Sequence, residues 1–234
     1  MRLLLKKDPE ADPALGRVFN EIIAAIIFLM ILLIFIQQLR FIQIFERRRI
    51  QSLQEYVKIE IEDSFKKEGL EKNLPSIIVD ENSPLIQKIL MTENVLTFKT
   101  GNVNLEQNID QKILELVGKI LLENEPIFEA VKVEGHADTI PLGLAIQNKY
   151  PTNWELSSGR AITVVRFLVE HLGFNPVKLS SVGFSSYHPI DPERLDLNRR
   201  IEFVIQYSYG EDYMYSDRAD KIYKEVKQMK NSGH

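Results

Sequence analysis

An apolar run near the N-terminus constrains this chain more than any other feature. Residues 18–36 read VFNEIIAAIIFLMILLIFI, and only Asn20 and Glu21 interrupt the apolar side chains. A helix of this length spans roughly 28 Å at about 1.5 Å per residue, close to the ~30 Å hydrocarbon core of a bilayer. We therefore predict a single transmembrane helix at residues 18–36, with one carboxyl group near its N-terminal end.

The sequence around this run favours a retained anchor over a cleaved signal peptide. The run is longer than the apolar core of a signal peptide, which is typically ~7–15 residues. The bulky, polar sequence QQLR follows at 37–40, where a signal peptide would have a cleavage site between small residues. Basic residues flank both ends of the run, so the positive-inside rule selects no orientation.

Composition excludes several classes of function. The chain has 29 basic and 33 acidic residues, a formal net charge of −4, which argues against nucleic-acid binding. It has no cysteine, so disulfides and thiolate chemistry are absent. The four histidines show no metal-ligand spacing, and neither His136 nor Ser157 lies in a hydrolase motif. We expect no enzyme activity, no bound metal and no cofactor.

The remaining chain divides by its pattern of apolar residues and turn formers. Residues 1–17 are charged and are expected to form a cytoplasmic tail. Apolar residues recur at helical spacing as far as Phe65, which predicts a helical connector over 37–82, either a solvated stalk or a partner-binding or dimerising helix. Residues 69–84 are rich in Gly, Asn and Pro and mark the domain boundary. The C-terminal residues 208–234 are expected to be weakly ordered or marginally helical.

Residues 83–207 have the pattern of an α/β (α+β) domain. Strand-like sequence at 86–98 is compatible with a hairpin that turns at 92–94, and further strands are predicted at 130–135, 178–184 and 201–207. Helices are predicted at 109–124 and 154–172, the second ended by Gly173. Because helices separate the strands, some of the strands are expected to pair in parallel.

Three short motifs in this domain carry the candidate chemistry: VEGHAD at 133–138, NWELSSGRA at 153–161 and NRR at 198–200. Asp138 lies just past a strand end, and Arg160 lies two turns into a helix whose N-cap we expect at Asn153. A carboxylate and a guanidinium that face one pocket can hold the ammonium and the carboxylate of a zwitterion. The competing interpretation is a structural ion pair between Asp138 and Arg160.

In this order, the three motifs resemble those of OmpA-like peptidoglycan-binding domains, which usually read GHTD, N-x-x-L-S-x-x-R-A and NRR. The resemblance covers roughly residues 90–207, with Ala137 where threonine is usual. It implies that Asp138 and Arg160 grip the diaminopimelate of the peptidoglycan stem peptide. It also implies that the pocket is completed by Thr139, Asn153, Leu156 and Arg200.

The layout of one apolar helix, a connector and this domain resembles the B subunits of ion-driven stators, the MotB and ZorB type. That resemblance implies a bitopic inner-membrane protein with a cytoplasmic N-terminus and a periplasmic domain. It further implies a homodimer of this chain inside a pentamer of a multi-spanning A subunit, with peptidoglycan as the anchor.

In such proteins an acidic residue of the membrane helix carries the translocated H⁺ or Na⁺, and Glu21 lies at the matching place where aspartate is usual. An interfacial carboxylate that reaches out of the bilayer is the alternative for Glu21. The absence of the flagellar Asp-centred pattern favours the Zorya antiphage type. A flagellar MotB-type subunit and a passive tether between membrane and cell wall remain the alternatives.

Overall fold

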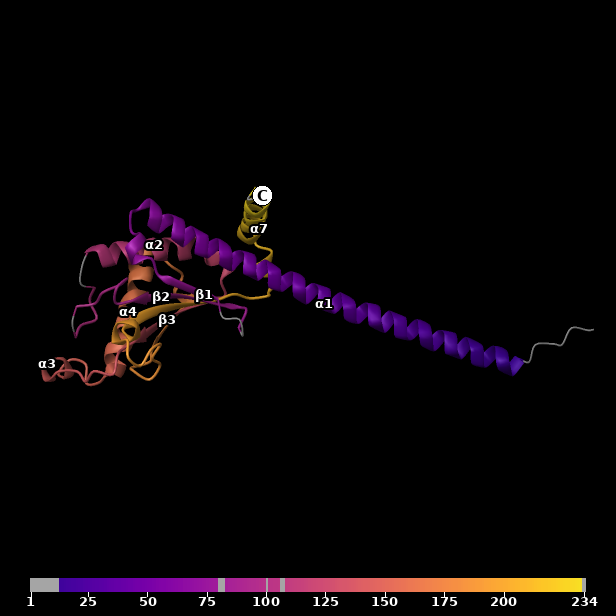
Figure 1. Ribbon diagram of the computed structural model, residues 1–234, viewed down its shortest axis with the longest axis horizontal. Coiled ribbons are helices and arrows are strands. Elements are labelled where there is room, and N and C mark those ends of the chain that lie inside the picture. The colour runs from indigo at the N-terminus through magenta and orange to yellow at the C-terminus, as the bar shows by residue number, and fades with distance from the viewer. Residues whose placement is uncertain (1–12, 80–82, 100, 106–107, 233–234) are drawn as a thin grey trace, which may run out of the picture. The chain divides into compact units, whose positions relative to one another are not determined.

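The computed structural model describes residues 13–79, 83–99, 101–105 and 108–232. The chain forms two compact units, residues 1–45 and 46–234. Helix α1 (Pro13–Lys67) contains the apolar run (Figure 1). The expected tail at 1–17 falls largely outside the described residues.

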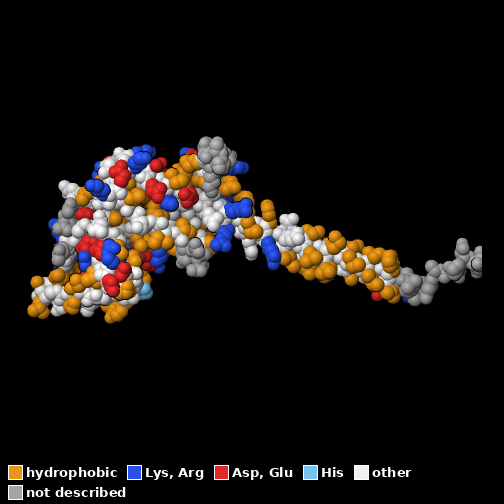
Figure 2. Space-filling view, in the orientation of Figure 1, with side chains coloured by type: hydrophobic (Ala, Val, Ile, Leu, Met, Phe, Trp, Pro, Cys, Tyr) orange, Lys and Arg blue, Asp and Glu red, His pale blue; other side chains and the backbone are white. Residues whose placement is uncertain are grey.

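The first unit is the apolar part of α1. Its side chains from residue 17 onward are exposed, and Figure 2 shows hydrophobic side chains gathered along it. Among the described residues, α1 is the one helix that is long and apolar enough to cross a membrane. Length and composition therefore agree with the predicted transmembrane helix.

The second unit contains a five-stranded sheet in the order β1-β2-β5-β3-β4. Strands β3 and β4 pair in parallel, and the other pairs are antiparallel. Helix α4 connects the two parallel strands, as the alternation of helices and strands predicted. The elements are η1 (Glu71–Asn73), β1 (Ser76–Val79), β2 (Ile86–Thr92), α2 (Asn108–Glu123), η2 (Glu125–Ile127), β3 (Ala130–His136), α3 (Leu144–Gln147), α4 (Asn153–Leu172), η3 (Pro176–Lys178), β4 (Leu179–Gly183), α5 (Leu195–Asn198), β5 (Arg200–Gln206), α6 (Glu211–Met214) and α7 (Asp217–Ser232).

The core lies on one face of this sheet. Alternate residues of the strands, such as Val131 and Val133 of β3 or Ile201 and Phe203 of β5, are buried against the apolar sides of α2 and α4. The intervening positions of the same strands face the other way and carry charged side chains, Glu134 among them. This alternation separates an apolar core from a polar face of the sheet.

The predicted hairpin at 86–98 is wrong. Strand β2 ends at Thr92, and its partners are β1 and β5. Strand β1 lies within the 69–84 segment that we expected to be only a boundary. Its four residues are too few to show an alternating pattern, and they stand between Pro75 and Pro84, which obscured them in the sequence.

The connector helix also differs from expectation. The apolar stripe of α1 is buried in the second unit from residue 50 onward, so this part is not a solvated stalk. The buried residues are Ile50, Leu53, Val57, Ile61 and Phe65. The compact unit therefore includes sequence that we had assigned to the connector.

Of the two alternatives for the C-terminal segment, the described residues as far as 232 favour the helical one over a weakly ordered tail, and their helices pack into the core. Helices α6 and α7 bury Met214, Ala219, Ile222 and Val226 in the same core cluster. The apolar residues of this face recur every three to five residues, as in a helix. The many Lys and Tyr residues between them obscured that pattern in the sequence.

Arg49 joins α1 to this C-terminal segment. Its Nε donates a 2.6 Å hydrogen bond to the Met214 carbonyl oxygen, and its guanidinium pairs with Asp220 and lies over the Tyr215 ring. The arginine run at 47–49 was interpreted as solvated, yet Arg49 is buried while Arg47 and Arg48 are exposed.

Candidate functional site

A cavity of about 370 Å³ lies where the loop after β3 meets the first turns of α4. Its polar lining comes from Glu93, Asp138, Asn153, Arg160 and Arg199. The apolar part of the wall comes from Phe98, Ala137, Leu156 and side chains of the 140–146 segment. The three sequence motifs are therefore brought together around one concave site.

Two glycines allow α4 to approach the parallel strands closely. Gly135 and Gly183 are register partners on β3 and β4. A Cβ atom at Gly135 would lie 2.1 Å from the Ser157 carbonyl oxygen, and one at Gly183 would lie 2.6 Å from the Ser158 backbone nitrogen. Only glycine fits at these contacts, so the glycine of the first motif is needed to seat the helix of the second motif.

The N-terminus of α4 is capped by Thr152, and the predicted cap at Asn153 is wrong by one residue. The Thr152 hydroxyl accepts a hydrogen bond from the Trp154 N–H at 3.1 Å, and Thr152 and Glu155 form a capping box. This frees the Asn153 side chain, whose Nδ2 donates to the Asp138 carbonyl oxygen at 3.1 Å. Asn153 therefore ties the helix to the loop that carries Asp138.

Asp138 lies two residues past β3 and is buried. One carboxylate oxygen accepts a 2.9 Å hydrogen bond from the Ile140 N–H, and the other accepts from the Arg199 guanidinium. The loop and Arg199 thus hold a carboxylate in a fixed orientation in the cavity wall.

Arg160 lines the cavity from α4. Its Nε donates to the Asn102 carbonyl oxygen at 3.1 Å, and its guanidinium lies 5.0 Å from the centre of the Phe98 ring. Burial lowers the pKa of Arg160, and the Glu93 carboxylate opposes this shift. Among the described residues, the terminal N–H groups of Arg160 make no further hydrogen bond, which leaves a fork of donors for a carboxylate.

The NRR motif contributes a different arginine from the one we predicted. Arg199 lines the cavity and pairs with both Asp138 and Glu93, and these hydrogen bonds raise its pKa. The guanidinium of Arg200 instead lies on the polar face of the sheet, where its Nε donates to Glu202 at 2.6 Å. Arg200 lines an adjacent small pocket and not this cavity.

Thr139 is the second predicted residue that lies outside the cavity lining, on an exposed turn. The other predicted residues Asp138, Arg160, Asn153 and Leu156 all line it. Glu93 was missed because it follows β2, far from the motifs in the sequence, and no local pattern singles it out.

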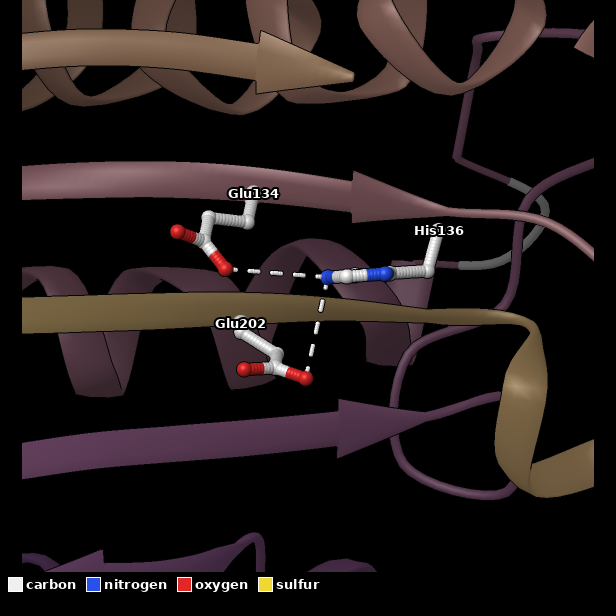
Figure 3. A group of neighbouring side chains, drawn as sticks. All are labelled: Glu134, His136 and Glu202. Carbon is white, nitrogen blue, oxygen red and sulfur yellow. Dashed lines mark ion pairs between the residues drawn. The ribbon is translucent and has the colours of Figure 1, made fainter. Parts of the chain in front are cut away.

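A buried charge network occupies the polar face of the sheet. Figure 3 shows the His136 ring with one nitrogen aimed between Glu134 and Glu202; Nε2 lies 3.7 Å and 3.6 Å from their carboxylates. At these distances neither ring nitrogen has a hydrogen-bond partner among the described residues. Burial lowers the pKa of His136, which favours the neutral ring.

The potential metal-ligand atoms of Glu134, His136 and Glu202 lie within 4.8 Å of one another, which is the spacing of a metal site. Both carboxylates, however, already pair with cations. Lys132 bonds Glu134, while Lys88 and Arg200 bond Glu202. A divalent ion here would face three neighbouring cations, so the arrangement favours an internal ion-pair network over a metal site. Burial alone would raise the pKa of Glu134, but His136, Lys132 and Lys88 outweigh it and lower that pKa to about 2.

Comparison with known protein families shows which domains this part of the chain resembles. Residues 97–201 match the OmpA family. This part of the chain, less than half of its length, is similar to OmpA-family domains. The match covers all three motifs and the cavity lining apart from Glu93, so the fold expected from the resemblance is confirmed.

Individual relatives extend this likeness beyond the family domain. The chain is 27% identical over 124 residues to uncharacterized protein YtxE and 24% identical over 155 residues to motility protein B, both from Bacillus subtilis. These alignments cover 51% and 64% of this chain but only 48% and 55% of the relatives, about half of their length. The chain is thus MotB-like, and neither relative is named as an enzyme.

A solved structure has the same fold. The crystal structure of a putative MotB-like protein from Desulfovibrio vulgaris matches with a TM-score of 0.60 and 23% sequence identity. The match covers 70% of this chain and 99% of that one.

Proposed function

We propose that the second unit binds peptidoglycan through the zwitterionic end of a diaminopimelate side chain. The arrangement of Asp138 and Arg160 carries this proposal, because a carboxylate and a guanidinium with free donors line one cavity. The ligand ammonium would bond to Asp138, and the ligand carboxylate would accept from the fork of Arg160. The match of residues 97–201 to the OmpA family supports the choice of ligand.

In this account the whole chain is the B subunit of a stator-like motor in the bacterial inner membrane. Helix α1 crosses the bilayer with its N-terminus in the cytoplasm, and two copies lie inside a pentamer of a multi-spanning A subunit. The OmpA-family domain holds the complex to the periplasmic cell wall. The candidate membrane helix and the likeness to motility protein B support this role.

Glu21 is the proposed carrier of the translocated H⁺ or Na⁺. It is the one acidic residue of the apolar run, and Ala24 and Ala25 follow it by three and four residues. Those positions lie on the same face of a helix, so the small side chains leave room beside the carboxyl group. An ionisable group in a membrane span is costly and usually serves a function. Antiphage defence of the Zorya type is the favoured process, with flagellar rotation as the alternative.

Sedimentation with purified sacculi tests wall binding. The full chain in detergent should sediment with sacculi, and Arg160→Ala should abolish sedimentation while Arg166→Ala, a substitution on the same helix outside the cavity lining, should retain it. Sedimentation of Arg160→Ala at the level of the unsubstituted chain would contradict the site.

A separate experiment tests the motor. Glu21→Gln removes the titratable group at almost constant size. It should therefore abolish the antiphage defence or the motility that the complex powers, and leave sedimentation with sacculi unchanged. If Glu21→Gln keeps full activity while Asp138→Ala abolishes it, the chain is a passive tether between membrane and wall.

A further inference from the structure

Two exposed arginines follow directly on the exposed apolar part of α1. Apolar side chains stay exposed as far as Phe45, mixed with polar ones beyond residue 36, and Arg47 and Arg48 come next. The helical segment 18–45 is roughly 42 Å long at about 1.5 Å per residue, which matches a bilayer with its headgroups at ~40–45 Å. A bilayer that covers these apolar side chains therefore has its polar surface near Arg47 and Arg48.

The neighbouring residue, Arg49, holds the C-terminal helix α7 at the same place. Its guanidinium pairs with Asp220 and lies 5.2 Å from the centre of the Tyr223 ring, both in the first two turns of α7. Arg49 follows Phe45 by four residues, only about 6 Å along the helix. The start of α7 therefore lies where the exposed apolar side chains of α1 end.

Two exposed lysines of α7 lie on the side of this helix that meets Arg49. Lys224 follows Asp220 by four residues, and Lys227 follows Tyr223 by the same interval. Residues four apart lie on one face of a helix, so both lysines continue the face that Arg49 contacts. The exposed charge nearest to Arg49 on α7 is therefore positive.

The acidic residues in the middle of α7 do not neutralise this face. Asp220 pairs with Arg49, and Glu225 pairs with Lys221. In the described part of the chain, Lys224 and Lys227 form no ion pair, and the same is true of the arginines at 47–48. Four basic side chains are therefore available to an anionic partner.

An exposed tyrosine accompanies these basic residues. The Tyr215 ring is centred 4.7 Å from the guanidinium carbon of Arg49, and the side chain is 51% exposed. Tyrosine is enriched where membrane meets water, because its ring is apolar and its hydroxyl is polar. An exposed tyrosine among basic residues fits a lipid surface better than bulk water.

We propose that α7 docks on the anionic phospholipid surface of the membrane that α1 crosses, with Lys224, Lys227 and the arginines at 47–48 at the headgroup phosphates. The inference rests on the membrane-crossing part of the proposed function and not on peptidoglycan binding. Lysine and arginine clusters beside a membrane helix or on an amphipathic helix attract anionic lipids, and their long side chains extend toward the headgroups. Each such residue strengthens the attraction roughly fivefold.

The test measures how close α7 lies to lipid headgroups, with the full chain in nanodiscs. One set of discs is neutral phosphatidylcholine, and in the other phosphatidylglycerol replaces about one third of it, enough to make the surface anionic. The chain has no cysteine, so Gln228→Cys places a single fluorophore on an exposed position of α7. A nitroxide on a small fraction of the headgroups quenches fluorophores that lie near them.

Quenching at position 228 should be at least about threefold stronger in the anionic discs than in the neutral ones. Salt at about 0.5 M should remove this gain, because it screens the attraction. A fluorophore at Leu144→Cys is the control label. Leu144 is 83% exposed on α3, which lies at the opposite end of the second unit from α7 (Figure 1), and its quenching should be weak in both discs.

Substitution of the lysines should remove the gain at position 228. In Lys224→Gln combined with Lys227→Gln, quenching should fall to about the neutral-disc level, since two of the four charges are lost. Lys66→Gln combined with Lys67→Gln is the matched control, because it removes two exposed lysines from the last turn of α1, and it should keep the gain. Unchanged hydrogen exchange of the β3 amides shows that a variant is folded. If the α7 variant misfolds, Arg47→Gln combined with Arg48→Gln decides instead.

The outcomes separate this inference from wall binding. Equal quenching at position 228 in both discs, or a gain that survives in the folded α7 variant, would overturn the docking of α7 on anionic lipid. Sedimentation with sacculi does not depend on these lysines, so it should be unchanged in that variant. Arg160→Ala, which should lose sedimentation, should keep the quenching gain, so failure of one proposal leaves the other standing.

Discussion

Arg199 bridges Asp138 and Glu93 in the wall of the cavity, so the carboxylate proposed to grip the ligand is already held by an internal cation. The Ile140 N–H holds the other oxygen of Asp138 at 2.9 Å. A ligand ammonium would join this arrangement as a third donor. The site is therefore ordered before ligand arrives, which reduces the entropy lost on binding.

Removing Arg199 should destabilise the domain. Arg199→Ala leaves two carboxylates without their shared partner, and we expect a loss of about 1–2 kcal/mol in the free energy of unfolding, reduced by the partial exposure of the pair. Chemical denaturation measures it. Arg194→Ala removes an arginine whose ion pair with Asp196 is exposed, and it should leave stability unchanged. Equal effects of the two substitutions would argue against a bracing role for Arg199.

Adding one methyl group at Gly135 should disturb the cavity indirectly, by displacing α4, which forms part of the cavity wall. In Gly135→Ala the new Cβ atom would meet the Ser157 carbonyl oxygen at 2.1 Å, so α4 must move away from β3. We expect about 1–3 kcal/mol of destabilisation and weaker peptide binding, since α4 carries Arg160. Gly143→Ala is the control for stability alone, because no atom lies within 4 Å of its Cβ position although the residue lines the cavity. A Gly135→Ala protein as stable as the control would contradict this packing.

Arg49 should stabilise the packing of the C-terminal helix α7. Arg49→Ala removes the hydrogen bond to the Met214 carbonyl oxygen and the pair with Asp220, so we expect a loss of about 2 kcal/mol. Hydrogen exchange of the α7 amides should speed up more than that of β3. Arg48→Ala, at the exposed neighbouring position, should change neither quantity. Unchanged α7 exchange in Arg49→Ala would show that the apolar contacts of α7 suffice.

The free energy of unfolding should fall on acidification, and the pH range of the fall should reflect the pKa values of Glu134 and His136 in the buried charge network. The pKa of Glu134 is lowered from 4.5 to about 2 in the folded chain, so its contribution is complete above about pH 4.5 and is lost as the pH falls toward 2. The pKa of His136 is also lowered on folding, so its protonation in the unfolded chain begins to cost stability below about pH 6.5.

Denaturation of the unsubstituted chain and of Glu134→Gln from pH 2 to 7 measures the contribution of the Glu134 charge to stability. The gap in unfolding free energy between them should be widest near neutrality and should close below pH 4.5. A gap independent of pH would show that the Glu134 charge contributes nothing.

The sequence was most informative where a residue pattern is local. Helices α2 and α4 and the stop at Gly173 follow from periodicity, and connection rules predict parallel pairing of some strands, which the structure shows for β3 and β4. The pairing of Asp138 with one arginine of NRR did not follow. Successive residues near a strand point to opposite faces, so only one of the two arginines can enter the cavity, and the register that selects Arg199 is tertiary information.

Other features were invisible in the sequence because their partners are distant in the chain. Arg49 lies in a basic run that reads as exposed, and its partner segment follows 165 residues later. Glu93 has no motif around it and becomes part of the site only through Arg199. The strained turn at Ser185 likewise depends on Ser157 and Ala137, which belong to other elements.

The most direct test of the central claim uses the charge of the ligand. Stem peptides containing diaminopimelate or lysine differ by one carboxylate, the group assigned to Arg160. Calorimetry on the full chain should show at least about tenfold tighter binding of the diaminopimelate peptide, and Arg160→Ala should bind the two peptides equally. Equal affinity of the unsubstituted chain for both peptides, or a preference that survives in Arg160→Ala, would contradict the account.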